Sequence, residues 1–431
     1  MCKSRKGTDV NNSLTPKSRP SRSASAANPS SSLSSSSSSN YPSFNYPSSS
    51  VNYSSSGFFN HNKDTSKSSS SSISSKLSLK SLKEAFLPEN PHIYEFADIC
   101  RATNNFLAKP FSSSSTSTSW RCQIRRKEVI IFQRKFRRRD PIELPELQQR
   151  LSIICRSHHS SLIKLLGAAT SGNCIYLVYE FVNGANLATC LRNPQNPSYT
   201  ILSNWLSRMQ VATDIAHGLD YIHHCAASNS GFIHNHIKSS SILVAEDSLN
   251  AKICHFGTAD LCGELEGSER SEARTLGRSN SKGMKIEGTR GYMSPEFQAN
   301  GIVTQKCDVY AFGVVVLELV SGEEALRYVF DESSGGFSRV SVIEKAREAV
   351  DSGAGGVRSW VDRRLKDSYP VDVAEKMVVV GLECVVEDPE KRPDMEQVAV
   401  RVSKLYLESK NWAEKIGKKL HATAGPGSKM D

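Results

Sequence analysis

The stretches Phe232-Ile-His-Asn-His-Ile-Lys-Ser-Ser-Ser-Ile-Leu-Val244 and Ala251-Lys-Ile-Cys-His-Phe-Gly257 decide the fold of this chain. They hold three histidines, two lysines and a run of serines, and apolar residues flank these polar groups. Apolar periodicity continues on both sides, from about residue 94 to residue 407. Roughly 310 residues are therefore left for a core, enough for a large two-lobed domain.

Residues 1–88 differ from the rest of the chain because serine and asparagine dominate them. Serine runs such as residues 30–39 and 68–72 bury too little apolar surface to offset the entropy lost on ordering. We therefore expect a disordered, serine-rich arm, and we expect the basic residues 408–431 to form a frayed tail. Serines beside basic residues in the arm and in residues 268–281 predict a phosphoprotein.

The chain has a net charge of +10, and a dense basic cluster contributes to it. The cluster consists of Arg121, Arg125, Arg126, Lys127, Arg134, Lys135, Arg137, Arg138 and Arg139. It is either a solvated surface with a charged loop or a contact for anionic lipid or an acidic partner segment. Nucleic acid is not expected as a partner, because no recognised binding motif accompanies the charge.

The 11 cysteines are scattered without a Cys-x-x-Cys pair, which is typical of reduced thiols inside the cell. No apolar run reaches the ~18 residues of a membrane span, and the polar start is not a signal peptide. We expect a cytoplasmic protein. Cys2, which lies among basic residues, also suggests a reversible peripheral contact with the plasma membrane.

The two opening stretches resemble the catalytic loop H-R-D-x-K-x-x-N and the metal-binding loop D-F-G of protein kinases. His234 and Lys238 match the first motif, and Phe256 and Gly257 match the second. The resemblance implies an α+β, bilobal protein kinase-like fold. Its residues of structural importance are largely retained, whereas those that perform the chemistry are not.

Four positions at which the family needs a specific group have changed. His236 replaces the catalytic-base Asp, Ser241 the metal-binding Asn, and His255 the metal-binding Asp; Phe132 replaces the ATP-binding lysine. Phosphoryl transfer needs a cation on the phosphates, oxygen ligands for magnesium and a carboxylate that orients the hydroxyl. We therefore expect no active catalytic residue apart from the retained Lys238, no metal site, and weak or absent binding of ATP and magnesium.

The resemblance places a vestigial ATP cleft at Ile130, Tyr179, Phe181 and Leu243, with Tyr179 as the gatekeeper. Ile130 adds bulk where adenine would lie. The phosphate-cradling loop corresponds to Lys109-Pro-Phe-Ser-Ser-Ser-Ser-Thr-Ser-Thr-Ser-Trp120, which contains no glycine. Such a run can still form a hairpin, but it cradles phosphate poorly because close approach of the backbone favours glycine.

Two alternatives remain open at these positions. Arg134 shares the face of Phe132 by the two-residue strand period, so it could supply the missing cation. In the family the positions of His236 and His255 face one cleft, so the two could bind a soft metal ion. A third ligand is offered only by Cys254, whose side chain should point the other way; otherwise the histidines are ordinary polar or core residues.

The segment Ile93-Tyr-Glu-Phe-Ala-Asp-Ile-Cys-Arg-Ala-Thr-Asn-Asn-Phe106 resembles the lead-in of plant receptor-like kinases, and its apolar spacing predicts a short amphipathic helix. Leu177-Val-Tyr-Glu-Phe181 and Asp308-Val-Tyr-Ala-Phe-Gly313 resemble the LysM receptor type. The resemblance covers residues 93–407, with a small lobe at about 93–182 and a large lobe at about 183–407. Without LysM modules and a membrane helix, it implies a cytoplasmic member.

Further elements follow from apolar patterns. A third helix is expected at residues 145–155, where either Leu147 or Glu146 occupies the place of the family's helix glutamate. Residues 162–167 and 175–181 are expected as strands, and residues 204–223 as a long helix whose His223 and His224 form a polar end rather than ligands.

The resemblance also predicts two braces in the large lobe. Asp308 should hold the catalytic loop from a buried helix that also contains Gly313, and Arg392 should pair with Glu296.

The function that the resemblance implies is that of a catalytically inactive, receptor-like cytoplasmic pseudokinase. It would act as a scaffold or allosteric partner in plant receptor-kinase signalling. Its partner would be an active receptor kinase or another signalling protein, with an anionic membrane surface as a further contact. The alternatives are an active Ser/Thr protein kinase with relocated catalytic groups and a membrane-associated adaptor.

Overall fold

The computed structural model describes residues 91–114, 117–137, 142–193, 195–224, 231–265, 288–332 and 335–423. The serine-rich arm, Cys2, Arg138, Arg139 and residues 268–281 lie outside these ranges, so what the sequence predicts for them stays a prediction. None of the helices in the described ranges is both long enough and apolar enough to cross a membrane.

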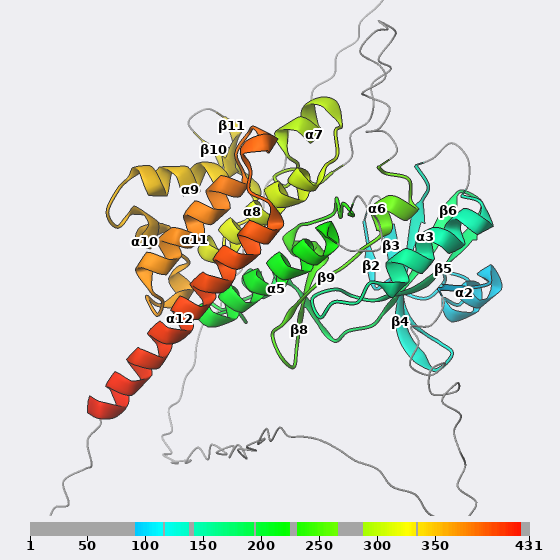
Figure 1. Cartoon of the computed structure of the whole chain (residues 1–431), viewed down its shortest axis with the longest axis horizontal. Coiled ribbons are helices and arrows are strands. Elements are labelled where there is room, and N and C mark those ends of the chain that lie inside the picture. Colours follow the sequence, from blue (N-terminus) through cyan, green and yellow to red (C-terminus); the bar gives the residue numbers. More distant parts are fainter. Residues whose placement is uncertain are drawn as a thin grey trace, which may run out of the picture. The chain divides into compact units, whose positions relative to one another are not determined.

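The small lobe contains a six-stranded sheet in the order β1-β5-β6-β4-β3-β2 (Figure 1). The strands are β1 (His92–Ile93), β2 (Ser112–Ser113), β3 (Ser117–Ile124), β4 (Lys127–Lys135), β5 (Leu165–Ser171) and β6 (Cys174–Glu180). The helices of this lobe are α2 (Phe96–Ala102) and α3 (Leu144–Arg156). The strand pair β1–β5 is parallel, and the other neighbours are antiparallel.

Alternate residues of strand β4 lie on opposite faces of this sheet. Val129 and Ile131 are buried and pack with Ile99 of α2, which confirms the predicted amphipathic helix. Because side chains alternate along a strand, Phe132 and Arg134 lie on the opposite face. This second face is the one that the candidate site uses.

Strand β5 begins three residues later than the sequence pattern predicts. Leu162 and Ile163 instead lie against β9 (Ala251–Ile253) of the large lobe, where Leu162 forms a bridge with Ile253 and the Ile163 N–H donates to the Ile253 carbonyl at 3.0 Å. The apolar run was correctly predicted to be buried. Its first residues satisfy their backbone groups between the lobes rather than in the sheet.

Helix α3 buries Leu147, Leu151 and Ile154, as predicted. The two candidates for the place of the family's helix glutamate differ in burial. Leu147 points into the core with 1% exposure, whereas Glu146 lies outside and pairs with Arg150 at 2.8 Å.

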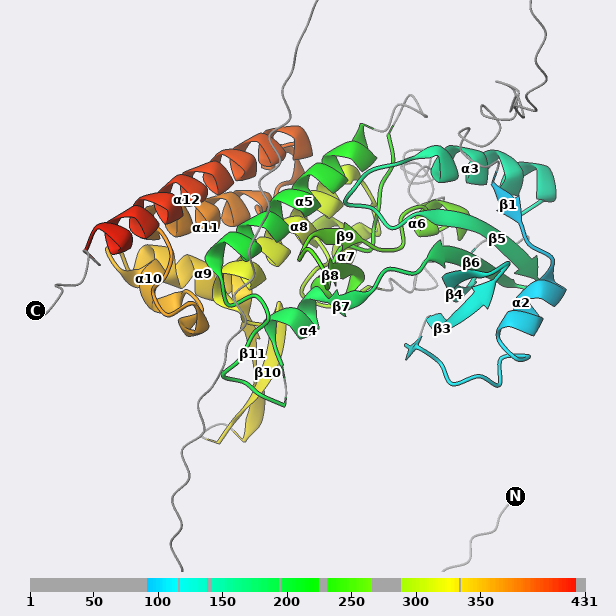
Figure 2. The same cartoon turned by 90° about the horizontal axis from the view of Figure 1, so that it is seen from below.

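The large lobe is mainly helical (Figures 1 and 2). Its long helices are α5 (Trp205–His223), α8 (Gln305–Ser321), α9 (Val342–Asp351), α11 (Val371–Cys384) and α12 (Met395–Thr423). Shorter helices are α4 (Leu187–Leu191), α6 (Thr258–Leu261), α7 (Pro295–Asn300), α10 (Gly356–Trp360) and the 3-10 turns Ser239–Ser241, Arg363–Leu365 and Pro389–Lys391. The strands are β7 (Gly184–Asn186), β8 (Ile242–Ala245) and β9, which form one sheet, and the hairpin β10 (Leu326–Asp331) with β11 (Gly336–Ser341).

Helix α8 forms the centre of the large lobe because it is buried along its length, from Cys307 to Ser321. A helix that is apolar on all sides packs in a core rather than at a surface. Gly313 lets α11 approach, since a Cβ atom there would lie 2.6 Å from the Cβ of Cys384. The expectation of a buried bracing helix is confirmed.

The C-terminal helix differs from the predicted boundary. α12 continues through residue 407 to Thr423, so the segment expected to be a frayed tail begins as helix. The cause is a tertiary contact: Ser409 is fully buried and accepts a hydrogen bond from the Trp205 indole at 2.9 Å.

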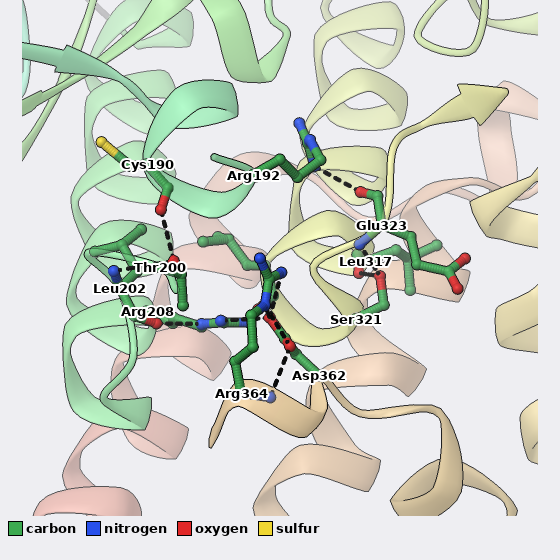
Figure 3. Close-up of polar contacts among 11 residues, drawn as sticks. Cys190, Arg192, Thr200, Leu202, Arg208, Leu317, Ser321, Glu323, Asp362 and Arg364 are labelled. Carbon is green, nitrogen blue, oxygen red and sulfur yellow. Dashed lines mark hydrogen bonds and ion pairs between the residues drawn. The ribbon is translucent and has the colours of Figure 1, made fainter. Parts of the chain in front are cut away.

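A buried ion pair ties α5 to the segment before α11 (Figure 3). Arg208 donates to an Asp362 carboxylate oxygen at 2.6 Å and to the carbonyls of Leu202 at 2.7 Å and Leu319 at 2.8 Å. Arg364 holds the same carboxylate from the other side at 2.8 Å. A guanidinium with this many partners can remain charged in a core.

The predicted Arg392–Glu296 pair is also present. The two nitrogens of the Arg392 guanidinium each donate to one Glu296 oxygen at 2.7 Å, which is the bidentate geometry of a strong charge-assisted pair. Burial alone would raise the pKa of Glu296, but its hydrogen bonds, chiefly with Arg392, lower it from 4.5 to about 2. This pair joins the start of α7 to the turn before α12.

Candidate functional site

Asp308 organises the loop that carries His234 and His236. One of its oxygens accepts a hydrogen bond from the His234 N–H at 2.7 Å, and the other accepts one from the Asn235 N–H at 2.8 Å. Burial alone would raise the pKa of Asp308, but the hydrogen bond and charge of His223, with His234, hold it below its usual value. The predicted brace is therefore confirmed.

His223 corrects one prediction. It was expected to be part of a polar helix end, but it is buried and its Nε2 lies 3.1 Å from the Asp308 carboxylate. No local pattern indicates this contact, because the two residues are 85 positions apart. His224, in contrast, is exposed and contacts Asp220 within its own helix.

His234 joins the two stretches that decided the fold. Its Nε2 donates to the Cys254 carbonyl at 2.8 Å, and its Nδ1 accepts from the His236 N–H at 3.2 Å. Burial lowers the pKa of His234 to about 4, so the ring is neutral near pH 7. A neutral ring with both nitrogens engaged by backbone groups is a structural element of the loop.

Ser241 uses its hydroxyl inside the same loop. The Oγ donates to the carbonyls of His236 at 2.5 Å or Lys238 at 2.9 Å and accepts from the Lys238 N–H at 3.1 Å. Ser241 is 2% exposed. The retained Lys238 points away from this hydroxyl, because its Nζ donates to Thr289 Oγ1 at 3.0 Å.

The positions of Phe132 and His255 meet across the cleft between the lobes. Their ring centroids are 4.5 Å apart with the planes at 84°, the edge-to-face arrangement that aromatic pairs prefer. Burial, followed by the positive charges of nearby basic residues, lowers the pKa of His255 well below its usual 6.5. The pair is therefore two uncharged rings in contact.

Tyr179 closes the inner end of this contact. Its hydroxyl donates to the Phe256 carbonyl at 2.9 Å and lies 3.0 Å from Thr258 Oγ1. Burial raises the pKa of Tyr179, so the hydroxyl stays protonated.

Arg121 is a residue of the cleft that sequence analysis placed only in the basic cluster. It is the β-sheet partner of Ile130, so both side chains lie on the cleft face of the sheet. Its guanidinium lies 3.8 Å from the centroid of the Phe181 ring, a cation–π contact, and also pairs with Glu128 at 3.0 Å. Leu243 lies in β8 and packs against the main core.

Glu264 is the charged residue that sequence analysis missed. One of its oxygens lies 3.0 Å from Arg134 and the other 2.8 Å from His236, and Arg137 is 4.0 Å from the first. We call Arg134, Arg137, His236 and Glu264 the cleft cluster. Arg134 thus lies on the predicted face. Glu264 gave no sequence signal, because only the folding of the segment after His-Phe-Gly brings it there.

The segment after Gly257 is held by further contacts with the small lobe. Arg150 of α3 pairs with Asp260 of α6 at 2.8 Å, and the Arg137 N–H donates to the Cys262 carbonyl at 2.9 Å. The small lobe therefore contacts the backbone segment that leads to Glu264.

The ion pairs of the cleft cluster should contribute stability that is lost at acid pH. Burial alone would raise the pKa of Glu264, but the hydrogen bond and charge of His236, then Arg134 and Arg137, lower it from 4.5 to about 2. A lowered pKa means that the stabilisation is present above pH 4.5 and is lost as the pH falls towards 2. We expect Glu264→Gln to lower the melting temperature near pH 7 and to have little effect at the acid end.

The measurement is thermal unfolding of both proteins across this pH range. Glu128→Gln is the matched control, since Glu128 pairs with Arg121 on the surface and both side chains are exposed. A melting difference for Glu264→Gln that stays constant from neutral to acid pH would contradict the assignment of the ion pair.

A cavity of about 1170 Å³ opens beside the cleft cluster. Its walls come from β3 and β4, the loop of His236 and Lys238, residues 288–297 and the start of α8. The four residues of the predicted ATP cleft are not part of its lining, which is formed further towards Thr289 and Tyr292. Among the described residues, no group of three His, Cys, Asp or Glu is arranged to hold a metal ion.

Comparison with known proteins agrees with this architecture. The family model described as protein tyrosine and serine/threonine kinase matches residues 118–402. The LysM domain receptor-like kinase 3 of Arabidopsis thaliana is 30% identical over 334 residues, which cover 75% of this chain and 48% of that protein. Chitin elicitor receptor kinase 1 of Arabidopsis thaliana is 32% identical over 321 residues, 74% of this chain and 47% of that protein.

A solved structure is also similar in fold. It is described as the pseudokinase domain of BIR2, an immune regulator of the RLK/Pelle family, and matches with a TM-score of 0.55 at 23% identity, covering 72% of this chain and 86% of that one. The chain spans about half the length of the curated receptor kinases that it matches. The chain belongs to the protein tyrosine and serine/threonine kinase family and is related to the LysM receptor-like kinases.

Proposed function

We propose that this chain does not transfer phosphate and acts as a non-catalytic scaffold or allosteric partner in plant receptor-kinase signalling. The observation that carries the proposal is the contact between Phe132 and His255 at 4.5 Å. The resemblance assigns these two positions to the lysine on the phosphates and the aspartate on magnesium. Two uncharged rings in contact supply neither a cation nor a hard oxygen ligand.

The surrounding residues do not fit magnesium and ATP either. The Ser241 hydroxyl is used by the backbone of its own loop, and Lys238 is turned towards Thr289. At the outer end, Arg121 lies over Phe181, beside the position at which Ile130 was expected to meet adenine. Each group would have to move before a nucleotide with its metal could be held.

The retained frame supports a role that depends on the folded surface. Asp308 and the Arg392–Glu296 pair keep the loop of His236 and the start of α7 in a fixed arrangement. The relatives named above are receptor kinases, so a receptor kinase or another signalling protein is the partner that we propose. A contact with an anionic membrane surface through Cys2 is a further proposal that concerns residues outside the described ranges.

One observation favours the alternative of an active Ser/Thr kinase with relocated groups. Arg134 enters the cleft two residues after Phe132, where it could replace the lysine. However, Arg134 is engaged by Glu264 and His236, and a single cation does not restore the metal ligands.

The proposal predicts that millimolar magnesium-ATP leaves the melting temperature of the full chain unchanged. A ligand at 100 times its dissociation constant stabilises a protein by about 2.7 kcal/mol, which would raise the melting temperature by several degrees. Thermal unfolding with and without magnesium-ATP measures this, with an active protein kinase as the positive control. Transfer of labelled phosphate to a generic substrate is measured in parallel.

The active-kinase alternative makes the opposite prediction. It requires a shift of several degrees and phosphate transfer that is lost in His236→Ala. That result would overturn the proposed function.

A further inference from the structure

The described residues that line the cavity beside the cleft cluster include more basic than acidic side chains. Four cationic side chains line it, namely Arg134, Lys135, Arg137 and Lys238, against the two carboxylates of Glu264 and Asp308. Asp308 contributes little to this balance, because His223 and the N–H groups of His234 and Asn235 already surround its oxygens. Among the described lining residues, the balance of charge therefore favours an anion.

A carboxylate of the chain itself, that of Glu264, already lies among these basic side chains. The Glu264 carboxylate is 8% exposed and lies 3.0 Å from Arg134, 2.8 Å from His236 and 4.0 Å from Arg137. These groups therefore already form a pocket for a negatively charged oxygen group. A phosphate has about twice the charge of a carboxylate and a third oxygen, so it suits two arginines and an imidazole better.

A further cation, Lys238, lies near the cluster. Apart from burial, Lys238 is among the groups that lower the pKa of His255, after His236 and Arg134. Arg134 also contributes, after burial, to the lowered pKa of Lys238. Lys238 lies on the cavity wall with its Nζ at Thr289, so a second cation is available to an anion in the cavity.

We propose that this cavity binds a phosphorylated peptide segment of a partner protein, with the phosphate taking the place of the Glu264 carboxylate. The cavity, at about 1170 Å³, is far larger than one phosphate group needs and can accommodate several residues of peptide. Its walls carry the hydroxyls of Ser117, Thr118 and Thr289, which can bond a peptide backbone.

A peptide fits better than a nucleotide because the aromatic contact of Phe132 with His255 and the stacking of Arg121 on Phe181 occupy the inner and outer parts of the former ATP cleft. The inference rests on the proposed function, since it assigns a phosphopeptide to a cleft that does not use ATP. Glu264 would then act as an internal competitor that the partner's phosphate must displace.

The test measures binding of a labelled pool of short peptides that share one fixed phosphoserine and have random neighbours. Fluorescence anisotropy is recorded with the full chain, and the same pool with unmodified serine is the reference. We expect the phosphorylated pool to bind at least tenfold more tightly, the difference that about one charge-assisted hydrogen bond provides.

Two double variants distinguish binding by the cleft cluster from attraction by the overall positive charge of the small lobe. Arg134→Gln/Arg137→Gln should reduce binding about tenfold or more, while Arg125→Gln/Arg126→Gln removes the same charge from the exposed β3–β4 turn and should change it little. Glu264→Gln should increase affinity, because the internal competitor loses its charge. A gain in affinity cannot result from unfolding of the variant. For the variants that lose affinity, melting curves show whether the protein is still folded.

Three outcomes would overturn the inference: equal binding of both pools, equal losses in the two double variants, or a preference for phosphatidylserine vesicles over the phosphopeptide pool. Inorganic phosphate that competes as well as the peptides at equal concentration would reduce the site to an ion site and also overturn it. Failure here leaves the proposed function intact if the chain still transfers no phosphate. Phosphorylation of the serine pool by the chain itself would instead overturn the proposed function.

Discussion

Replacing Asp308 with alanine should lower the melting temperature by about 10 °C, because the mutation should cost about 3–5 kcal/mol of unfolding free energy. The carboxylate is 1% exposed, so water cannot replace it without opening the core. Its removal leaves the N–H groups of His234 and Asn235 without their acceptor and His223 without its buried partner. Unsatisfied buried donors are among the most destabilising defects in a protein.

Asp372→Ala is the control for this experiment, because Asp372 makes an exposed pair with Lys376 at 3.7 Å and should be worth little. Thermal unfolding of the three proteins gives the comparison. A loss for Asp308→Ala no larger than that for Asp372→Ala would show that the loop does not depend on its brace.

Asp308 illustrates which parts of the site could be predicted from the sequence. Motifs with fixed spacing located His236, Ser241 and His255, and the strand period placed Arg134 on the face of Phe132. These predictions rest on local patterns, in which the residue type and its neighbours carry the information. The contact between Phe132 and His255 was not itself predicted, because the two residues lie far apart in the sequence.

The residues that were missed depend on contacts between distant parts of the chain. Glu264 meets Arg134 across 130 positions, and His223 meets Asp308 across 85. Neither residue has a local pattern that indicates its partner, and a histidine at a helix end is usually a solvated group. The helical continuation of α12 past residue 407 has the same origin, because the contact of Ser409 with Trp205 spans 204 positions.

The elements of regular structure were predicted more reliably because burial imposes a period on them. Leu147, Leu151 and Ile154 predicted the buried face of α3, and the structure buries all three. Strand β5 began late for a reason that no period reveals: Leu162 and Ile163 are apolar, but their backbone pairs with the large lobe. Apolar runs thus predict burial more securely than they predict the partner of the backbone.

Breaking the buried Arg208–Asp362 pair should also lower the free energy of unfolding strongly (Figure 3). Burial, partly offset by Asp362, lowers the pKa of Arg208, so the charge of the guanidinium depends on that carboxylate. Asp362→Ala would leave Arg208 as a buried charge with only carbonyl partners and should cost about 3–5 kcal/mol. Asp367→Ala, which breaks the exposed pair with Arg358, is the control.

Removing the other member of the pair, by Arg208→Met, should cost less than Asp362→Ala. The reason is that each substitution leaves a different charge in the core, and among the described residues only Asp362 has a second charged partner. Asp362 would keep Arg364, whose side-chain and backbone nitrogens donate to its oxygens at 2.8–3.1 Å. Within the described part of the chain, the other hydrogen-bond partners of Arg208 are two carbonyls, at 2.7 and 2.8 Å. The double variant should therefore be less destabilised than the sum of the single ones. Unfolding in denaturant gives the three free energies, and an equal cost of both single substitutions with simple additivity would contradict this account of the core.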